Sequence, residues 1–347
     1  DPEELDRRTQ TNTRGSGQAL IGRLLRGCLD RGIVPKTNHR ALQLLMQDRR
    51  ITGVKFNTPD GHEEIIADAV ILCTGGFEWD EDFKRAFLRG PMTHPVSIET
   101  NTGDGLRMAM RAGAMLGNMR EAWWMPVIEV PKEEISTGVN LLAGTRSLPR
   151  SIMINKKAKR FVNESANYNV FGAAFHEQDV SEFSYGNLPC WMIFDQGFID
   201  QYGFGLFPDP GVAPPQWVTS AKTIPDLASR LGVPADGLEA TISRWNEQVA
   251  NGQDDDFNRG EAAHDRWWGD PAHRDSAKAS LGPIDQGPYY AVEVKSGALG
   301  TKGGPRVNPN ANVLDVDGEP IQGLYAAGNV MASPMGMTYG GPGGTIA

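Results

Sequence analysis

The stretch ADAVILCTGGF, residues 67–77, decides the fold that we expect, because an apolar strand in it stops abruptly at paired glycines. Residues 69–73 are apolar on every side, which predicts a strand buried on both faces. The stretch GLYAAGNV, residues 323–330, has the same form. Ligands of open α/β sheets sit at the carboxyl edge of the strands. Each motif therefore predicts a ligand against the backbone, although either one alone is equally compatible with a tight turn that binds nothing.

Helices and strands alternate around the two motifs. Apolar spacing predicts helices over 16–32, 101–116 and 235–254, two short strands within 150–164, and a strand over 289–294. A composition shift begins near residue 126, where Pro, Trp and polar residues become frequent. We therefore expect an α/β domain made of residues 1–130 and 289–347, interrupted by an α+β capping or substrate domain of residues 131–288.

The composition excludes several classes of function. The chain has 34 basic and 43 acidic residues and a net charge of −9, without a basic block, so we expect no nucleic-acid partner. Its three cysteines stand singly, which is typical of a reducing compartment. No apolar run approaches the roughly 20 residues of a transmembrane helix. We expect a cytoplasmic protein, either free or peripheral to a membrane. No group of Cys, His or carboxylate residues has metal-ligand spacing, so no metal site is predicted.

Six segments in order resemble one flavoprotein family across nearly the whole chain. They are ADAVILCTGGF, NTGDGLRMAMRAGA, SIMINKKAKRFVNES, DGLEATISRWNEQVANGQDDDF, GPYYAVEV and GLYAAGNVMAS. The family includes fumarate reductases, succinate dehydrogenase flavoprotein subunits and 3-ketosteroid dehydrogenases. The resemblance implies a Rossmann-like FAD-binding domain with an inserted capping domain. The family's G-x-G-x-x-G motif is absent, so we expect a fragment that lacks the first βαβ unit and the last helix.

The resemblance also implies an FAD site. The positions that match the family's cofactor contacts are Ala41, Thr74, Gly75, Gly76, Gly328, Asn329, Gly343, Gly344 and Thr345. Thr74, Gly75 and Gly76 would lie near the adenosine and diphosphate, and Gly328 and Asn329 would approach the ribityl chain. The amides of residues 343–345 would face the flavin ring, and Ala41 would touch adenine through its backbone.

Three positions separate this chain from the dicarboxylate reductases that it resembles. Arginines of those relatives correspond to Tyr168 and Tyr339 here, and a histidine corresponds to Gly300. Without these charges a dicarboxylate would lose ionic hydrogen bonds of about 1.5–3 kcal/mol each. The closing stretch GMTYGGPGGTIA, residues 336–347, instead resembles that of 3-ketosteroid Δ1-dehydrogenases. In that subfamily the residues matching Tyr339 and the amide of Gly343 bind the ketone oxygen.

These matches predict an FAD-dependent dehydrogenase that introduces a double bond beside a ketone, in the first ring of a 3-ketosteroid. Tyr168 is the candidate base, and its phenol, with an ordinary pKa near 10, needs a helper from the region upstream. The electron acceptor is unidentified. One alternative is a flavin-dependent enoate or fumarate-type reductase, and another is a non-catalytic flavoprotein remnant.

Three further expectations concern polar residues. Asp104 is a plausible N-cap of the helix over 101–116. His176 could relay a proton, but a solvated helix histidine is favoured. The acidic run at 254–256 is most simply a solvated turn.

Overall fold

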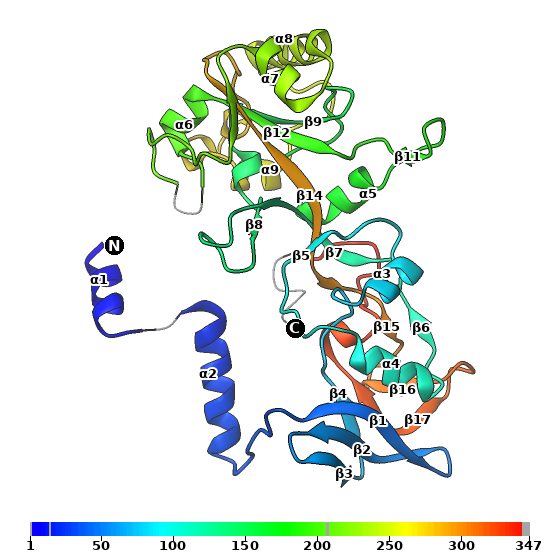
Figure 1. Cartoon of the computed structure of the whole chain (residues 1–347). Coiled ribbons are helices and arrows are strands. Elements are labelled where there is room, and N and C mark those ends of the chain that lie inside the picture. Colours follow the sequence, from blue (N-terminus) through cyan, green and yellow to red (C-terminus); the bar gives the residue numbers. More distant parts are fainter. Residues whose placement is uncertain (1, 14, 206–207, 342–347) are drawn as a thin grey trace.

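The computed structural model describes residues 2–13, 15–205 and 208–341. These residues form two bodies joined by one long strand, with an N-terminal helical arm beside the lower body (Figure 1). Two sheets, called sheet 1 and sheet 2 below, organise the lower and the upper body respectively. The expected α/β fold is confirmed.

Sheet 1 combines strands from residues 40–72 with strands from residues 312–326. Its strands are β1 (Arg40–Gln47), β2 (Arg50–Thr58), β3 (Gly61–Ile66), β4 (Val70–Leu72), β16 (Asn312–Leu314) and β17 (Pro320–Ala326). The order is β1-β2-β17-β16, with β3 on β2 and β4 on β17. Strands β4 and β17 are parallel, and Leu72 is paired with Ala326 at their ends. The two glycine-ended motifs therefore open at the same edge of one sheet.

At β4, one face of sheet 1 is covered and the other is exposed. Helix α4 (Asp104–Arg111) contributes Met108 to a core cluster that also contains Leu72 and Leu324. The expectation that β4 is buried on both faces is wrong, because Ile71 is 65% exposed. Successive side chains of a strand point to opposite faces, and only the face of Leu72 is packed against α4.

The start of α4 differs from the prediction. Gly103, with φ +72°, is the N-cap, and Asp104 is the first helical residue. The Asp104 carboxylate accepts two hydrogen bonds from Arg40, at 2.8 and 2.9 Å. Asp104 therefore ties α4 to β1 and does not cap its own helix.

Sheet 2 is built around the 13-residue strand β14 (Tyr289–Thr301). The others are β5 (His94–Pro95), β7 (Ala122–Glu129), β8 (Val139–Leu141), β9 (Ser151–Asn155), β12 (Cys190–Asp195) and β13 (Thr219–Ala221). The order is β8-β7-β14-β12-β9, with β13 and β5 also on β14. β14 pairs with β12 up to Val294 and with β7 from Lys295 onward. One strand thus passes from the upper body to the lower, and the boundaries near 130 and 289 remain predictions.

Alternating side chains of sheet 2 supply two separate cores. Ile152 and Ile154 of β9 pack with Trp245 of α8 (Ala235–Asn251) in one cluster. Met153, between them in the sequence, belongs to a second cluster with Phe194. Helices α7 (Ile224–Leu231) and α8 supply the first cluster, as the apolar spacing of residues 235–254 predicts.

Only the first of the two strands expected within residues 150–164 is present, as β9. The turn after it is closed by the Asn155 amide, which donates to the Lys159 carbonyl at 3.0 Å. Arg160 and Glu164 then enter buried ion pairs. The backbone that carries these charges follows an irregular path, so the second predicted strand is wrong.

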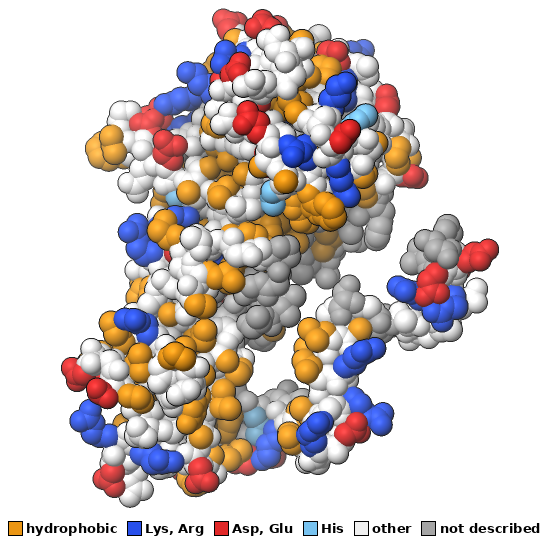
Figure 2. Space-filling view, turned by 180° about the vertical axis from the view of Figure 1, so that it is seen from behind, with side chains coloured by type: hydrophobic (Ala, Val, Ile, Leu, Met, Phe, Trp, Pro, Cys, Tyr) orange, Lys and Arg blue, Asp and Glu red, His pale blue; other side chains and the backbone are white. Residues whose placement is uncertain are grey.

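The N-terminal arm consists of α1 (Pro2–Gln10) and α2 (Ser16–Leu29), and Gly32, with φ +72°, follows the second helix. The helical spacing expected over residues 16–32 is confirmed, but the apolar face is exposed at Leu20, Ile21, Leu24, Leu25 and Leu29. Apolar side chains show on both α2 and the adjacent body (Figure 2). Within the described ranges, none of the helices has the length and apolarity that crossing a bilayer requires.

Smaller elements complete the described chain. They are α3 (Glu81–Phe87), α5 (Phe171–Phe175), α6 (Gln196–Tyr202), α9 (Ala263–Trp268), the pairs β6 (Leu116–Gly117) with β15 (Gly304–Pro305) and β10 (Gln178–Asp179) with β11 (Ser184–Tyr185), and short 3₁₀ turns. Two of these turns, Tyr168–Val170 and Gly328–Val330, carry residues that the sequence assigns to the site.

Candidate active site

Tyr168 and Tyr339 meet directly. Tyr168 begins a 3₁₀ turn that precedes α5, and Tyr339 lies in the stretch after residues 333–338. Their hydroxyl groups share a hydrogen bond, and their ring centroids are 4.7 Å apart. Two phenols 171 positions apart in the chain are therefore at one place.

The phenol of Tyr168 is a weak acid here. Burial, together with the hydrogen bond to Tyr339, holds the pKa of Tyr168 well above its usual value. Both effects favour the neutral form, since burial disfavours a charge, and the hydrogen bond in the arrangement in which Tyr168 donates it is lost when Tyr168 ionises. At neutral pH the hydroxyl of Tyr168 is therefore protonated and uncharged.

Trp123 connects Tyr339 to the edge of sheet 1. Its ring contacts the Tyr339 ring edge to face, with centroids 6.3 Å apart. Its Nε1–H donates to Asn329 Oδ1 at 3.1 Å. Asn329 belongs to the 3₁₀ turn that follows β17. The tyrosine pair and a predicted cofactor residue are thus bridged by one buried indole.

The carboxyl ends of β4 and β17 can accept a ligand. Cys73, Thr74, Ala327 and Gly328 are all exposed at these ends. Gly328 has φ +76°, and a Cβ added there would meet nothing within 4 Å. Exposed backbone on adjacent parallel strands, with open space at a left-handed glycine, fits the approach of an extended cofactor. The residues present therefore fit FAD at this edge.

Gly75 and Gly76 have a reason to be glycine within the chain itself. A Cβ at Gly75, where φ is +72°, would lie 2.4 Å from Asn101 Oδ1. A Cβ at Gly76 would lie 2.1 Å from Thr301 Oγ1 and 2.3 Å from Glu78 Oε2. The two glycines allow these polar side chains to pack under the loop after β4, so their contact with a cofactor remains a prediction.

At the position where the dicarboxylate reductases have a histidine, a side chain would collide with Asn329. A Cβ at Gly300 would lie 2.7 Å from Asn329 Nδ2. Asn329 is itself held through its Oδ1 by Trp123. A larger residue at 300 would have to displace Asn329.

Other predicted cofactor residues are not tested by the geometry. Ala41 is half-buried in β1, paired with Phe56. Gly343, Gly344 and Thr345 lie outside the described residues, so their assignments to FAD and to the ketone stay predictions. Within the described ranges, no group of His, Cys, Asp or Glu could hold a metal ion.

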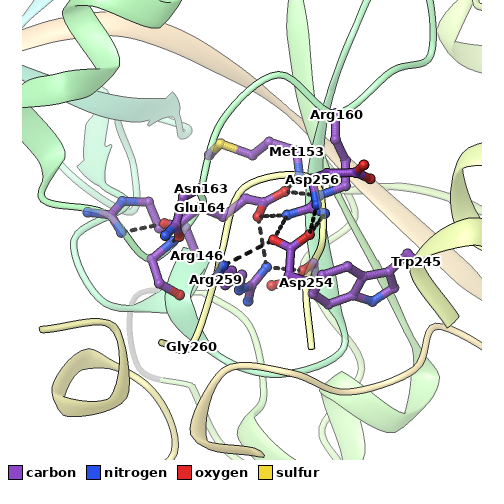
Figure 3. A network of polar contacts seen from close by, with 12 residues as sticks. Arg146, Met153, Arg160, Asn163, Glu164, Trp245, Asp254, Asp256, Arg259 and Gly260 are labelled. Carbon is purple, nitrogen blue, oxygen red and sulfur yellow. Dashed lines mark hydrogen bonds and ion pairs between the residues drawn. The ribbon is translucent and has the colours of Figure 1, made fainter. Parts of the chain in front are cut away.

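A buried ion network joins residues 160–164, just before Tyr168 in the chain, to residues 254–259 (Figure 3). Arg160 binds both oxygens of Glu164, at 2.9 and 2.8 Å, and both oxygens of Asp254, at 2.8 and 2.9 Å. Arg259 adds a 3.1 Å bond to Glu164. We call Arg160, Glu164, Asp254 and Arg259 the ion network. The expectation that residues 254–256 form a solvated turn is wrong for Asp254, which is fully buried because Arg160 neutralises it.

Arg146 links the ion network region to Tyr168. Its guanidinium donates to the Glu164 carbonyl at 2.7 Å and to the Ala166 carbonyl at 2.9 Å. It also lies over the Phe171 ring, 4.9 Å from the centroid. The backbone just before Tyr168 is thereby held by one buried cation, which also contacts the ring of Phe171 after it.

His176 is buried, which corrects the expectation of a solvated histidine. Its Nε2 is 3.1 Å from both the Pro91 carbonyl and Ser296 Oγ. Burial, and secondarily the charge of Arg89, lowers the pKa of His176 to about 4, although the bond to Pro91 opposes this shift. His176 is therefore neutral at physiological pH and joins α5 to β14.

The sequence pattern misses three polar residues around the pair. Asn169 donates from Nδ2 to the Met337 carbonyl at 3.3 Å. Lys302 is completely buried and donates to the Thr338 carbonyl at 2.9 Å. Arg146 is the third. Lys302 stands in the stretch GTKGG next to Gly300, where a lysine between small residues gives no sign of burial.

Comparison with known proteins supports the flavoprotein assignment. The family model described as FAD binding domain matches residues 3–346. A 4-oxocyclohexanecarboxylate 2-dehydrogenase of Sinomonas cyclohexanicum is 38% identical over 99% of this chain and 60% of its own length. A 3-oxosteroid 1-dehydrogenase of Mycobacterium tuberculosis is 39% identical over 97% of this chain and 62% of its own length.

A solved structure is similar throughout the fold. The 3-ketosteroid Δ1-dehydrogenase of Sterolibacterium denitrificans, in complex with 1,4-androstadiene-3,17-dione, aligns with a TM-score of 0.84 and 35% identity. The alignment covers 92% of this chain and 58% of that one. The chain thus spans about three fifths of the length of the relatives that it matches. The match over residues 3–346 and the open strand ends agree on the cofactor, FAD, and the chain belongs to the FAD binding domain family of flavoproteins.

Proposed function

We propose that the protein uses FAD to dehydrogenate the carbon–carbon bond beside a ring ketone, in the first ring of a 3-ketosteroid. The contact between the hydroxyls of Tyr168 and Tyr339 carries this proposal. Both positions hold uncharged donors where dicarboxylate reductases hold arginines, and a histidine in place of Gly300 would have to displace the Asn329 side chain. A neutral substrate with one carbonyl matches such a site.

Tyr339 would polarise the ketone. Its hydroxyl donates a hydrogen bond to the carbonyl oxygen, and the amide of Gly343, beyond the described residues, would supply a second donor. Removal of a proton next to the ketone places negative charge on that oxygen. A pre-aligned donor to such an oxyanion lowers the activation free energy by about 3–4 kcal/mol.

Tyr168 would accept the proton from carbon 2. Each hydroxyl has a single proton, so Tyr339 cannot donate to the ketone and to Tyr168 at the same time. When Tyr339 donates its hydrogen bond to a ketone, its oxygen can still accept a hydrogen bond from the protonated hydroxyl of Tyr168. The raised pKa of Tyr168 makes the ionised form scarce, so the base needs a helper, as the resemblance implies.

FAD supplies the oxidising half of the reaction, since the bound cofactor accepts the hydride that leaves carbon 1. The electron pair of the broken carbon–hydrogen bond at carbon 2 becomes the second bond between carbons 1 and 2 as the hydride leaves. Gly328 and Asn329 would hold the cofactor at the ends of β4 and β17. Trp123 bridges Asn329 and Tyr339, so it would set the depth of the substrate pocket next to the cofactor. The acceptor that reoxidises the cofactor, and a cytoplasmic location, stay predictions.

A ring keto acid is a second candidate substrate. One relative, 38% identical, is named a 4-oxocyclohexanecarboxylate 2-dehydrogenase. The ketone chemistry at Tyr339 would be the same for both substrates. They differ in whether the far end of the molecule is an apolar ring system or a carboxylate.

The test uses the purified chain carrying FAD, with a dye as electron acceptor. We expect conversion of 4-androstene-3,17-dione into 1,4-androstadiene-3,17-dione, and faster turnover of this substrate than of 4-oxocyclohexanecarboxylate. Tyr339→Phe should lower turnover about 10²–10³-fold while the flavin absorbance of the protein is unchanged. Turnover equal to that of the unmodified protein would refute the role of Tyr339. Absence of bound flavin both from this chain and from the full-length gene product would leave only the remnant alternative.

A further inference from the structure

Lys302 connects three segments of the site through hydrogen bonds. It follows β14 directly and is completely buried. Its amide donates to the Glu121 carbonyl at 2.9 Å, and its carbonyl accepts from the Ser333 amide at 2.9 Å. The backbone of Lys302 therefore fixes the start of β7 and the beginning of residues 333–339, which we call the closing segment.

The ammonium group of Lys302 has two neighbours. Nζ donates to the Thr338 carbonyl at 2.9 Å. Nζ also lies over the Trp123 ring, 4.3 Å from its centroid. Burying a charge costs several kcal/mol unless hydrogen bonds and nearby charges compensate it. A carbonyl and an aromatic face are partial compensation, so a lysine here costs stability that methionine would not.

Both neighbours of the ammonium group are also neighbours of Tyr339. Thr338 precedes it in the chain, and the Trp123 ring contacts the Tyr339 ring. The opposite end of the closing segment is held separately, because Asn118 Nδ2 donates to the Ser333 carbonyl. Lys302 is thus placed to set the direction in which the phenol of Tyr339 points.

We propose that Lys302 is a positioning residue for Tyr339, which holds the Thr338 carbonyl and the Trp123 ring so that the phenol is aimed at Tyr168 and at the substrate ketone. This inference rests on the proposed role of Tyr339. It adds a residue that does not touch the reacting atoms but determines where the donor to the ketone lies.

The test compares Lys302→Met with Lys302→Arg. Methionine matches the length of lysine but has neither the charge nor the donor, whereas arginine keeps both. Lys84→Met is the control for loss of a buried lysine elsewhere, because Lys84 is also buried, and its Nζ contacts the Met92 carbonyl at 3.0 Å and Glu81 at 2.6 Å, outside the tyrosine site. Each variant is measured for amide hydrogen exchange, steady-state turnover and flavin absorbance.

We expect Lys302→Met to speed amide exchange in the closing segment and to lower kcat. Because a hydrogen bond to a charged group is lost, we expect a change of about 10–100-fold in both the amide exchange rate and kcat. Lys302→Arg should return the exchange rate and kcat most of the way to the values of the unmodified protein, and Lys84→Met should change neither value. Exchange in the closing segment needs no substrate, so it tests the positioning role even if the unmodified protein oxidises no ketone.

The pH profile of turnover tests whether Lys302 positions Tyr339 through its charge or only by packing. Burial and the charge of Arg89 lower the pKa of Lys302 to about 8, and Glu121 opposes this shift. A neutral amine binds the carbonyl and the ring more weakly. In the unmodified protein, turnover should rise with pH and level off above about pH 8, where Lys302 loses its proton. In Lys302→Arg, whose side chain stays charged, turnover should continue to rise. Unchanged exchange and kcat in Lys302→Met, or identical pH profiles in all variants, would overturn the proposal.

Discussion

Tyr168 and Tyr339 share one hydrogen bond but are held in place by opposite kinds of structure. Tyr168 follows Glu164 of the ion network by four residues, and two carbonyls just before it, those of Glu164 and Ala166, are bound by the buried Arg146. Tyr339 ends the closing segment, which Lys302 and Asn169 hold through single bonds to carbonyls. The support of Tyr168 is multiply charged and completely buried, whereas that of Tyr339 depends on a few separate contacts.

This difference predicts where substitutions act. In a buried network, removal of one charge leaves others uncompensated, so the free energy of unfolding should fall. In the closing segment each contact is single, and its loss should alter the direction of the phenol more than the stability of the fold. Substitutions near Tyr168 are therefore expected to change stability, and those near Tyr339 to change turnover.

The largest effect is expected for Glu164→Gln. Burial alone would raise the pKa of Glu164, but Arg160 and Arg259, with the Met153 amide, lower it to about 2. Glutamine keeps the shape and leaves both arginines without their shared anion. Urea unfolding at neutral pH should show a loss of about 3–5 kcal/mol. A loss below about 1 kcal/mol, the value of an exposed pair, would show that the network is dispensable.

The same carboxylate should govern acid stability. Its pKa is depressed in the folded state, so its stabilising contribution is complete above the unfolded value of 4.5 and is lost as the pH falls toward about 2. The Glu164→Gln variant should lack this part of the acid transition. Equal acid slopes in the two proteins would contradict the assignment.

The second prediction concerns the pH dependence of turnover. Burial and the bond to Tyr339 raise the pKa of Tyr168, so the ionised base is a minor species throughout the neutral range. Its population grows about tenfold for each pH unit below the pKa, and kcat/KM should rise accordingly from about pH 6 to pH 8. Tyr168→Phe should be slow and independent of pH. A flat profile in the unmodified protein would assign the proton transfer to another group.

The ends of the parallel strands β4 and β17 are predictable from the sequence, but the burial of their side chains is not. Residues 67–77 and 323–330 predict strand ends, and the structure places them side by side. Burial was predicted wrongly at Ile71, because an apolar run indicates apolar surroundings without showing which faces are covered. Long-range packing, which the local pattern does not contain, decides that question.

The residues that hold the tyrosines could not be found from the sequence for a related reason. Asp254 stands in an acidic run and Lys302 between small residues, and both patterns are typical of solvated surface. Asp254 is buried because Arg160, 94 positions away, neutralises it. Lys302 is buried because Trp123 and Thr338 enclose it. Tyr168 and Tyr339 were identified because the resemblance supplied their positions, and their mutual contact is known only from the structure.

The smallest expected effect is for Asp104→Asn, and it isolates the contribution of burial. Arg40 binds both oxygens of Asp104, at 2.8 and 2.9 Å, in the same two-bond geometry that joins Arg160 to Glu164. The side chain of Arg40 is 62% exposed, whereas that of Arg160 is 4% exposed.

Water and salt screen the exposed pair, so we expect Asp104→Asn to lower the free energy of unfolding by about 0.5–1 kcal/mol. The loss should shrink in about 1 M salt, measured by urea unfolding beside Glu164→Gln. Because the bond to Arg40 lowers the pKa of Asp104, the contribution of Asp104 should also disappear as the pH falls below its ordinary value of 3.8. Equal losses in the two variants would mean that geometry, rather than burial, sets the strength of these ion pairs.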